Sequence, residues 1–307
     1  MNILITGGAG FLGSRLAREL LQRGHLGSRR IERVMLADLV APRDAALVND
    51  ARVQTQAGDL QASLSALFAQ RWDAVFHLAS AVSAECEADF DLGLHANLDT
   101  TRRLLDACRQ QTLQGHPAPM FFFSSSVAVY GSDPALPLPA VVGDDTLPTP
   151  QSSYGIHKFV CEQLVADYTR KGFIDGRAAR LMTVSVRPGR PNGAASGFLS
   201  GMLREPLAGQ PSNCPVPLDT PVALSSPATT IAGIIAVAEA SREAFGGRTA
   251  INLPALSLRV SDMLDALAAF AGREATALVS HEPDAATARI VAGWPSLFHS
   301  PRAQALG

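Results

Sequence analysis

A tyrosine and a lysine lie four residues apart in the stretch YGIHK (154–158), within a segment that has the pattern of a helix start. Side chains at positions i and i+4 of a helix share a face, so Tyr154 and Lys158 are expected to point into the same space. A free tyrosine, with a pKa of about 10, is a poor base near neutral pH, but a nearby ammonium group favours its phenolate form. Tyr154 is therefore a candidate general base that removes a proton from a substrate hydroxyl.

A serine triplet, SSS (124–126), follows the apolar run MFFF and is expected to end a strand. A serine hydroxyl at that place could hold the substrate oxygen while the base takes the proton, and we assign this role to Ser126. The pattern Tyr-x-x-x-Lys also occurs by chance in many proteins. The assignment of Ser126, Tyr154 and Lys158 as catalytic residues therefore depends on what else the chain contains.

Three glycines, Gly7, Gly10 and Gly13, stand in TGGAGFLG (6–13), between the first expected strand and the first expected helix. Glycines at this spacing allow a tight turn and bring the backbone close to the pyrophosphate of a dinucleotide, which lies on the helix N-terminus. A tight turn without a ligand is the alternative, but the strand–turn–helix placement favours the dinucleotide. The nicotinamide of such a cofactor would accept hydride as Tyr154 takes the proton, and its positive charge would further favour the phenolate.

An aspartate, Asp38, ends the second expected strand. A carboxylate at this position can accept both ribose hydroxyls of an adenosine and would repel a 2′-phosphate, which favours NAD over NADP. The nearby Arg43 could offset that repulsion. We expect NAD as the cofactor.

Two further strand ends carry side chains that could meet the cofactor. Asp59, in GDL, could reach the adenine, or it could be an ordinary cap at a strand end. In HLAS (77–80) the small Ala79 and Ser80 would let a cofactor cross the strand ends. His77 could be catalytic, although a histidine packed in the core is the favoured interpretation.

Short apolar runs alternate with amphipathic, helix-like segments over the first 190 residues. Apolar strands alternating with helices are typical of a parallel sheet covered on both faces. We therefore predict an α/β fold with a Rossmann-like, doubly wound parallel sheet. Its strands are expected at 3–6, 34–39, 53–60, 73–79, 120–126 and 182–189, and its longest helices at about 91–114 and 152–171.

Beyond residue 188 the chain becomes rich in proline and glycine, as in RPGRPNGAASGF. A helix is expected at 228–242, a strand at 250–254, and an amphipathic helix through Val260, Met263, Leu264, Leu267 and Phe270. These features predict two interleaved parts. Residues 1–187 and 225–254 form the NAD-binding domain, and residues 188–224 and 255–307 form a small C-terminal substrate-binding lobe.

The composition is that of an ordinary globular protein: 307 residues, 47% hydrophobic, with a formal net charge of -2. This balance gives no reason to expect nucleic acid or a membrane surface as a partner. No stretch approaches the roughly 20 apolar residues of a membrane span, and no signal-peptide pattern opens the chain. The four cysteines have no metal-like or redox-like spacing, so we expect a cytoplasmic protein with reduced cysteines and no metal site.

With these motifs in place, the chain resembles the extended short-chain dehydrogenase/reductase family, which includes nucleotide-sugar epimerases. The resemblance rests on TGGAGFLG, Asp38, GDL, HLAS, SSSVAVYG and YGIHK. It implies that Ser126, Tyr154 and Lys158 are catalytic and that the lysine also holds the nicotinamide ribose. It further implies that Asn97 is associated with the cofactor, and that Pro188 and Gly189 lie in the strand-end stretch over the nicotinamide.

The motifs and the resemblance together give a complete set of expected cofactor contacts: Gly7, Gly10, Phe11, Leu12, Gly13, Asp38, Asp59, Leu60, His77, Leu78, Ala79, Asn97, Ser124, Tyr154, Lys158, Pro188 and Gly189. Relatives commonly form dimers through two long helices, here about 91–114 and 152–171. A homodimer is therefore expected.

Two departures from the family patterns narrow the function. Dehydratases carry Thr-Asp-Glu where this chain has SSS (124–126), and epimerases usually continue Arg-Pro with an Asn-Val-Tyr-Gly-Pro-like run, where this chain has RPGRPNGAASGF. The small lobe also has little room for a nucleotide. Segments such as DYTRKGFIDGRAARL and LSSPATT look like a branch of the family that oxidises a small sugar acid. This resemblance implies NAD-dependent oxidation of the hydroxyl next to a carboxylate, giving a 2-oxo acid.

A small hydroxy acid needs a cation for its carboxylate, and arginine fits a carboxylate with two parallel hydrogen bonds. Arg187, Arg190 and Arg204 lie in or near the loop-rich segment. We favour Arg190, with Asn192 beside it for hydroxyls, so the expected substrate contacts are Ser126, Tyr154, Arg190 and Asn192. Surface positions in a loop are the alternative for both.

Two other functions remain open at this stage. A nucleotide-sugar 4-epimerase would use the same Ser, Tyr and Lys but retain a tightly bound cofactor. A non-catalytic regulator that senses NAD(P) could share the fold, but such proteins often lack the Tyr–Lys pair that this chain keeps.

Overall fold

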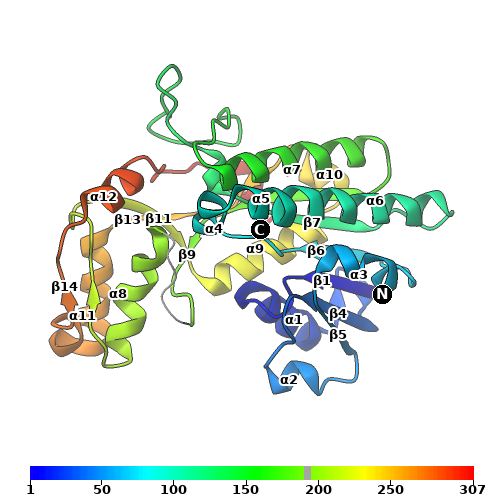
Figure 1. Cartoon of the computed structure of the whole chain (residues 1–307), viewed down its shortest axis with the longest axis horizontal. Coiled ribbons are helices and arrows are strands. Elements are labelled where there is room, and N and C mark those ends of the chain that lie inside the picture. Colours follow the sequence, from blue (N-terminus) through cyan, green and yellow to red (C-terminus); the bar gives the residue numbers. More distant parts are fainter. Residues whose placement is uncertain (190–194) are drawn as a thin grey trace.

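A seven-stranded parallel sheet forms the centre of the molecule (Figure 1). The computed structural model describes residues 1–189 and 195–307. The strands follow the order β12-β8-β7-β6-β1-β4-β5. Their bounds are β1 (Asn2–Thr6), β4 (Arg33–Asp38), β5 (Val53–Ala57), β6 (Ala74–His77), β7 (Met120–Ser126), β8 (Asp175–Leu181) and β12 (Ile251–Asn252). The predicted α/β, doubly wound architecture is confirmed, and the strand order reverses between β1 and β6.

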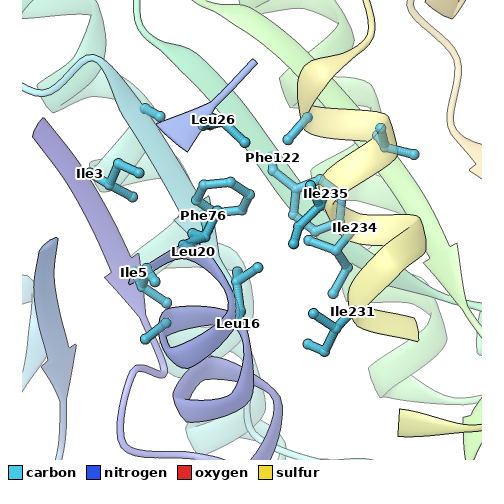
Figure 2. Close-up of a cluster of buried hydrophobic side chains, with 14 of the residues drawn as sticks. Ile3, Ile5, Leu16, Leu20, Leu26, Phe76, Phe122, Ile231, Ile234 and Ile235 are labelled. Atoms are coloured by element: carbon cyan, nitrogen blue, oxygen red, sulfur yellow. The ribbon is translucent and has the colours of Figure 1, made fainter. Parts of the chain in front are cut away.

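One face of the sheet is covered by α1 (Phe11–Arg23) and α9 (Pro227–Glu239), which lie side by side. Successive residues of a strand point to opposite faces, and Ile3 and Ile5 of β1 point to this one. Figure 2 shows them with Phe76 of β6, Phe122 of β7, and leucines and isoleucines of the two helices. This apolar cluster fixes α1, and therefore the turn that precedes it, against the sheet.

The opposite face is covered by α3 (Leu60–Leu67), α6 (Thr100–Leu113) and α7 (Ser153–Arg170). Here the alternate strand residues Leu4, Val75, Phe121 and Phe123 pack against Leu104 and Leu105 of α6 and against Cys161 and Val165 of α7. The helix that carries Tyr154 is thus held by a buried apolar face along much of its length.

The strand expected at 182–189 is wrong: the sheet strand that follows β7 is β8, seven residues earlier. The segment DGRAARL did not look like a buried strand because it contains Arg177 and Arg180, yet both are buried. Arg180 forms an ion pair with Glu162, and Arg177 donates to the Ala240 carbonyl oxygen at 2.6 Å. Paired in this way, charged side chains can lie inside an α/β sheet.

A smaller lobe lies at one end of the sheet (Figure 1). Its three-stranded sheet consists of β9 (Thr183–Val184), β11 (Pro221–Ser225) and β13 (Leu256–Arg259), and a second pair joins β10 (Ser212–Asn213) to β14 (Val279–Ser280). Its helices are α8 (Phe198–Leu207), α11 (Val260–Thr276) and α12 (Ala285–Ala292). Buried side chains of α8, β11 and α11 form a separate apolar core for this lobe.

The predicted division of the chain at 187, 224 and 254 stays a prediction. Two elements, β9 and the last helix, lie across this predicted division. β9 lies before residue 187 and pairs with β11 of the small lobe. The last helix, α13 (Pro301–Gln304), packs on β12, and its Ala303 belongs to the core of the large sheet. The chain therefore crosses between the two parts once more near its C-terminal end.

The amphipathic helix expected after residue 257 is present as α11, with Val260, Met263 and Leu267 buried. Phe270 does not extend this stripe, since its side chain is 83% exposed. The helix is interrupted at Gly272, where φ is 82°. The apolar face therefore ends earlier than the sequence pattern indicates.

Short elements connect these units. They are β2 (His25–Leu26), β3 (Arg29–Arg30), α2 (Ala45–Val48), α4 (Ser83–Ala88), α5 (Phe90–Gly93), the π-helix η1 (Leu94–Asp99), the 3-10 turns η2 (Val127–Val129) and η3 (Ala195–Gly197), and α10 (Arg242–Phe245). In the described part of the chain, no helix has the length and apolar character needed to cross a membrane. All four cysteines are free and buried.

Candidate active site

The glycine turn between β1 and α1 is built by close backbone approaches. Gly7 has a φ of 71°, and a Cβ there would lie 2.7 Å from the Ala79 nitrogen. A Cβ on Gly13 would lie 2.0 Å from the Gly7 carbonyl oxygen. Side chains at these two positions would push α1 away from the strand ends. The glycines are therefore required by the packing of the turn itself.

The first turn of α1 is suited to an anion. Its N-cap is Gly10, which has no side chain to accept from the helix N–H groups, and residues 11–13 include no acidic side chain. Within the part of the chain that the structure describes, no side-chain cap satisfies this end. Uncapped N–H groups and the helix dipole favour a phosphate group. The residues present thus fit the pyrophosphate of a dinucleotide beside Gly10, Phe11 and Leu12.

Asp38 lies at the carboxyl end of β4, beside the glycine turn. Its carboxylate accepts a hydrogen bond from the Ala9 N–H at 3.0 Å. The turn and the aspartate are therefore fixed relative to each other, one strand apart. Contact of Asp38 with a ribose stays a prediction.

The other residues expected near the adenosine have visible structural roles. Asp59 caps α3, since its carboxylate accepts from the Ala62 N–H at 2.8 Å, and Leu60 is the first residue of that helix. The alternative interpretation of Asp59 as a cap thus describes a contact that is present. Contact of Asp59 and Leu60 with a cofactor is untested.

His77 is packed in the core, as favoured above. Its ring nitrogens lie 2.7 Å from the Thr6 hydroxyl and 2.9 Å from the Thr101 hydroxyl. Burial, together with the charge of Lys158, lowers the pKa of His77 to about 3. The ring is therefore neutral at physiological pH and is not available as an acid or base.

The loop after β6 lies against the glycine turn and is held by Asn97. Leu78 donates its N–H to the Thr6 carbonyl oxygen at 3.1 Å, and Ala79 is the closest neighbour of Gly7. The buried Asn97 amide oxygen accepts from the Ser80 hydroxyl at 2.9 Å and the Ala81 N–H at 2.8 Å. Asn97 therefore positions this loop, and its predicted association with the cofactor would act through the loop.

Each serine of the triplet has a different hydrogen-bond partner. The Ser124 hydroxyl donates to the His77 carbonyl oxygen at 3.0 Å, and the Ser125 hydroxyl donates to the Glu162 carboxylate. Ser126, at the end of β7, accepts from the Ala128 N–H at 3.1 Å. Of the three, Ser126 is the one whose hydrogen bonding lowers the pKa of Tyr154.

Tyr154 and Lys158 face the same space in the first turns of α7. Ser152 caps this helix by accepting from the Gly155 N–H at 3.1 Å. The Lys158 ammonium donates to the Ser124 carbonyl oxygen at 2.8 Å and lies 5.5 Å from the centre of the Tyr154 ring. The i, i+4 spacing thus produces the expected juxtaposition, and the ammonium is tied to the end of β7.

The ionisation of Tyr154 differs from the expectation. Burial raises its pKa to about 12, while hydrogen bonding to Ser126 and Ser80 and the charge of Arg187 act in the opposite direction. Burial also lowers the pKa of Lys158, to about 8. In the chain by itself, the lysine therefore does not bring the tyrosine into the working range, because desolvation has the larger effect.

The remaining predicted residues lie in the segment after β8. Because β8 ends at Leu181, Pro188 and Gly189 do not directly follow a sheet strand, and both are exposed. Their place over a nicotinamide stays a prediction. Arg190 and Asn192 lie outside the described residues, so their expected substrate contacts are untested. No group of three or more His, Cys, Asp or Glu in the described ranges is arranged to hold a metal ion.

Glu162 and Arg180 were not among the residues singled out from the sequence. Glu162 lies one helical turn beyond Lys158 and pairs with Arg180 at 2.8 Å, and both side chains are almost fully buried. Tyr154, Lys158 and Glu162 follow one another at a spacing of four residues, and this spacing could have indicated Glu162 from the sequence.

Comparison with known proteins identifies the family of this chain. The model of the NAD dependent epimerase/dehydratase family matches residues 3–220. The chain belongs to this family. It is accordingly an NAD-dependent oxidoreductase of the type that acts on CH–OH groups, and NAD is its cofactor.

Two similar proteins align with this chain over its whole length. A D-erythronate dehydrogenase of Cupriavidus necator is 49% identical over 100% of this chain and 93% of its own length. A D-erythronate dehydrogenase of Haemophilus influenzae is 41% identical over 100% of this chain and 94% of its own length.

Solved structures that are similar to this chain have the same fold. A protein from Agrobacterium tumefaciens, described as a nucleoside-diphosphate-sugar epimerase, superposes with a TM-score of 0.93 at 40% identity, covering 100% of this chain and 89% of that one. A GalE-like L-threonine dehydrogenase of Cupriavidus necator in its holo form gives 0.83 at 22% identity, over 100% and 93% of the two chains. The second likeness concerns the fold alone.

Gly155 provides the first test of the site geometry. A Cβ at this position would lie 2.1 Å from the Ala128 carbonyl oxygen, in the turn that follows Ser126. Gly155→Ala should therefore displace the start of α7 and reduce kcat by about 100-fold, because a shift of about 1 Å in a reacting group has that effect. NAD affinity, measured by fluorescence titration, should remain within a few-fold. Unchanged kcat would show that Tyr154 does not depend on this approach.

Lys158 provides a test of the electrostatics. Its pKa in the folded chain is about 8, below the ordinary lysine value of 10.5, so burial of the charged form destabilises the fold at neutral pH. This penalty is present below pH 8 and disappears as the pH rises from about 8 to 10.5, because the folded chain then releases its proton first. Lys158→Met should raise the free energy of unfolding at pH 7 by up to about 3 kcal/mol, measured by urea denaturation without NAD.

The same variant should lose its stability advantage as the pH approaches 10, while remaining inactive. A Lys158→Met protein that is less stable than the parent at pH 7 would show that the hydrogen bond to Ser124 outweighs the cost of burying the ammonium.

Proposed function

We propose that this protein is an NAD-dependent dehydrogenase that oxidises the 2-hydroxyl of a small sugar acid, converting D-erythronate to 2-dehydro-D-erythronate. The two D-erythronate dehydrogenases that are similar over the whole chain support this choice of substrate. The observation that supports the reaction type is the position of Lys158, whose ammonium lies 5.5 Å from the centre of the Tyr154 ring. Hydrogen bonding to Ser126 and Ser80 also lowers the pKa of Tyr154. This is an arrangement for removing one proton from one hydroxyl.

In the proposed mechanism, Ser126 donates a hydrogen bond to the substrate oxygen, and Tyr154 accepts the proton of that hydroxyl. Lys158 keeps its place through the Ser124 carbonyl oxygen and supplies positive charge beside the phenolate. Bound NAD supplies the hydride acceptor and a second positive charge. The positive charge of both groups is needed because the pKa of Tyr154, raised mainly by burial, is about 12 in the protein without the cofactor.

The serine triplet disfavours a dehydratase. Elimination of water from a sugar needs an acid and a base at the end of β7, and that position holds only hydroxyls. The carboxylate nearby, Glu162, is buried and accepts two hydrogen bonds from Arg180 and one from Ser125. It is therefore held as a structural anion rather than as a proton carrier.

A panel of four- to six-carbon aldonic acids tests the proposal. Purified protein, NAD and each acid are mixed, and the absorbance of NADH is followed. We expect net NADH formation with D-erythronate and slower formation with longer acids. A protein that produces no NADH with any acid but interconverts two nucleotide sugars would be a 4-epimerase, and the proposal would be wrong.

Tyr154→Phe tests the base. Removing the hydroxyl should lower kcat by about 100- to 10,000-fold, the usual contribution of general acid–base catalysis, while NAD affinity is retained. Tyr168→Phe is the matched control, because Tyr168 lies on the same helix and its hydroxyl bonds Asp106 at 2.6 Å, away from the site. Substantial turnover by the Tyr154 variant, measured as NADH formation, would exclude this residue as the base.

A homodimer and a cytoplasmic location complete the proposal. Ile156 and Val160 of α7 and Phe90 and Leu92 of α5 expose apolar side chains on neighbouring helices. Such residues on the two long helical segments favour pairing of two copies through this face. Buried free cysteines are consistent with a reducing compartment.

A further inference from the structure

Tyr154 lies in the part of its helix that the helix itself supports least. α7 begins at Ser153, so Tyr154 is its second residue. The first four N–H groups of a helix have no acceptor within the helix, and helix ends fray. A proton acceptor at this place keeps a fixed position only when groups outside the helix hold the first turn.

Two oxygen atoms hold the backbone on either side of Tyr154. The Ser152 hydroxyl accepts from the Gly155 N–H at 3.1 Å, which is a local cap. The Glu87 carboxylate accepts from the Ser153 N–H at 2.8 Å, although Glu87 is 66 residues away in the sequence. Among the residues that the structure describes, this is the one hydrogen bond between α4 and α7.

α4, the helix that carries Glu87, is itself fixed in place. Its N-terminus is capped by Glu85, whose carboxylate accepts from the Val82 N–H at 2.8 Å. The neighbouring Cys86 is buried, and the Asn97 amide donates to its Sγ at 3.2 Å. The same Asn97 side chain holds the loop after β6, which packs on the glycine turn. Through α4, the first turn of α7 is therefore connected to the loop at the expected cofactor site.

The Glu87 side chain is exposed, so packing does not force it onto α7. A carboxylate at a helix N-terminus is attracted by the unpaired N–H groups and by the helix dipole, and hydrogen bonds to ionised groups are the stronger ones. The alternative is an ordinary capping contact that contributes to stability alone. The position of Tyr154, directly after the residue that Glu87 holds, favours a role in the reaction.

We propose that Glu87 is a positioning residue for the reaction: by tying the first turn of α7 to α4, it holds the Tyr154 hydroxyl where it can remove the substrate proton. This inference rests on the proposed function, in which Tyr154 is the base. Glu87 acts through the backbone of Ser153 and takes no part in the chemistry itself.

Two substitutions separate the hydrogen bond from the charge. Glu87→Ala removes the acceptor, whereas Glu87→Gln keeps an acceptor oxygen without the charge. With NAD and D-erythronate, Glu87→Ala should lose about tenfold in kcat, with KM and NAD affinity within about twofold of the parent, because the base is displaced while the binding groups stay in place. Glu87→Gln should keep kcat within about threefold of the parent. Both variants change an exposed side chain, so both are expected to fold.

Glu239→Ala is the matched control. Glu239, the last residue of α9, also accepts a long-range backbone N–H bond, from Gly27 at 2.7 Å, and pairs with Arg23. These contacts lie beyond the C-terminal ends of α1 and α9, at the amino ends of the strands and away from Tyr154. The control should lower the thermal unfolding midpoint at least as much as Glu87→Ala and leave kcat unchanged.

The ultraviolet absorbance of tyrosinate tests the position of Tyr154 without any substrate. The chain has only three tyrosines, and burial raises the pKa of Tyr130, Tyr154 and Tyr168. If Glu87→Ala lets the first turn of α7 open, water reaches Tyr154, and one tyrosine should titrate closer to the ordinary pKa of about 10. This titration should be absent from Glu87→Gln and from the double variant with Tyr154→Phe.

The proposal is wrong if either kcat or the tyrosinate titration is unchanged in Glu87→Ala. Equal changes in Glu87→Ala and Glu87→Gln would assign the effect to the charge of the carboxylate, and would overturn the proposal as well. A parent protein that oxidises no acid would overturn the proposed function. The titration, which needs no substrate, would then still decide whether Glu87 holds Tyr154 in place.

Discussion

The buried ion pair between Glu162 and Arg180 joins the helix of the candidate site to the sheet. Glu162 is on α7, Arg180 is near the end of β8, and the Ser125 hydroxyl at the end of β7 donates to the same carboxylate. Arg180 also donates to the Tyr130 hydroxyl, which reaches Asn252 of β12. One carboxylate therefore links α7 to two strand ends and, through Arg180 and Tyr130, to a third strand.

A buried ion pair of this kind contributes little net stability compared with apolar packing, but removing one partner is costly because the other charge remains buried. Its effect here is geometric. It holds α7 against the ends of β7 and β8, and Tyr154 lies in the first turn of this helix, two residues after the cap at Ser152. The close approach at Gly155 and the bond from Lys158 to Ser124 act on the same contact.

Much of this arrangement could be predicted from local patterns. Glycine spacing, apolar strand runs and the four-residue step from Tyr154 to Lys158 depend on backbone geometry that repeats within a few residues. β8 could not be predicted in this way, because the partners of Arg177 and Arg180 come from Ala240 and Glu162, which are distant in sequence. The raised pKa of Tyr154 could not be predicted for a similar reason, because the burial that causes it depends on packing between segments that are distant in the sequence.

The protonation state of Tyr154 is expected to depend on which ligands are bound. Burial disfavours both the phenolate and the ammonium, so a deprotonated tyrosine becomes accessible only when further positive charge enters. The oxidised cofactor would supply it when it binds. The phenolate form of Tyr154 would then be favoured while the oxidised cofactor is bound.

The central claim is that hydride leaves C2 of a small sugar acid for NAD, and a deuterium label tests it most directly. D-Erythronate carrying deuterium at C2 is mixed with the protein and NAD, and the reduced cofactor is isolated and analysed by mass spectrometry. The account predicts that the label is found in the reduced cofactor, with a rate lower than that of the unlabelled acid. Label that returns to the sugar acid or exchanges into water would contradict it.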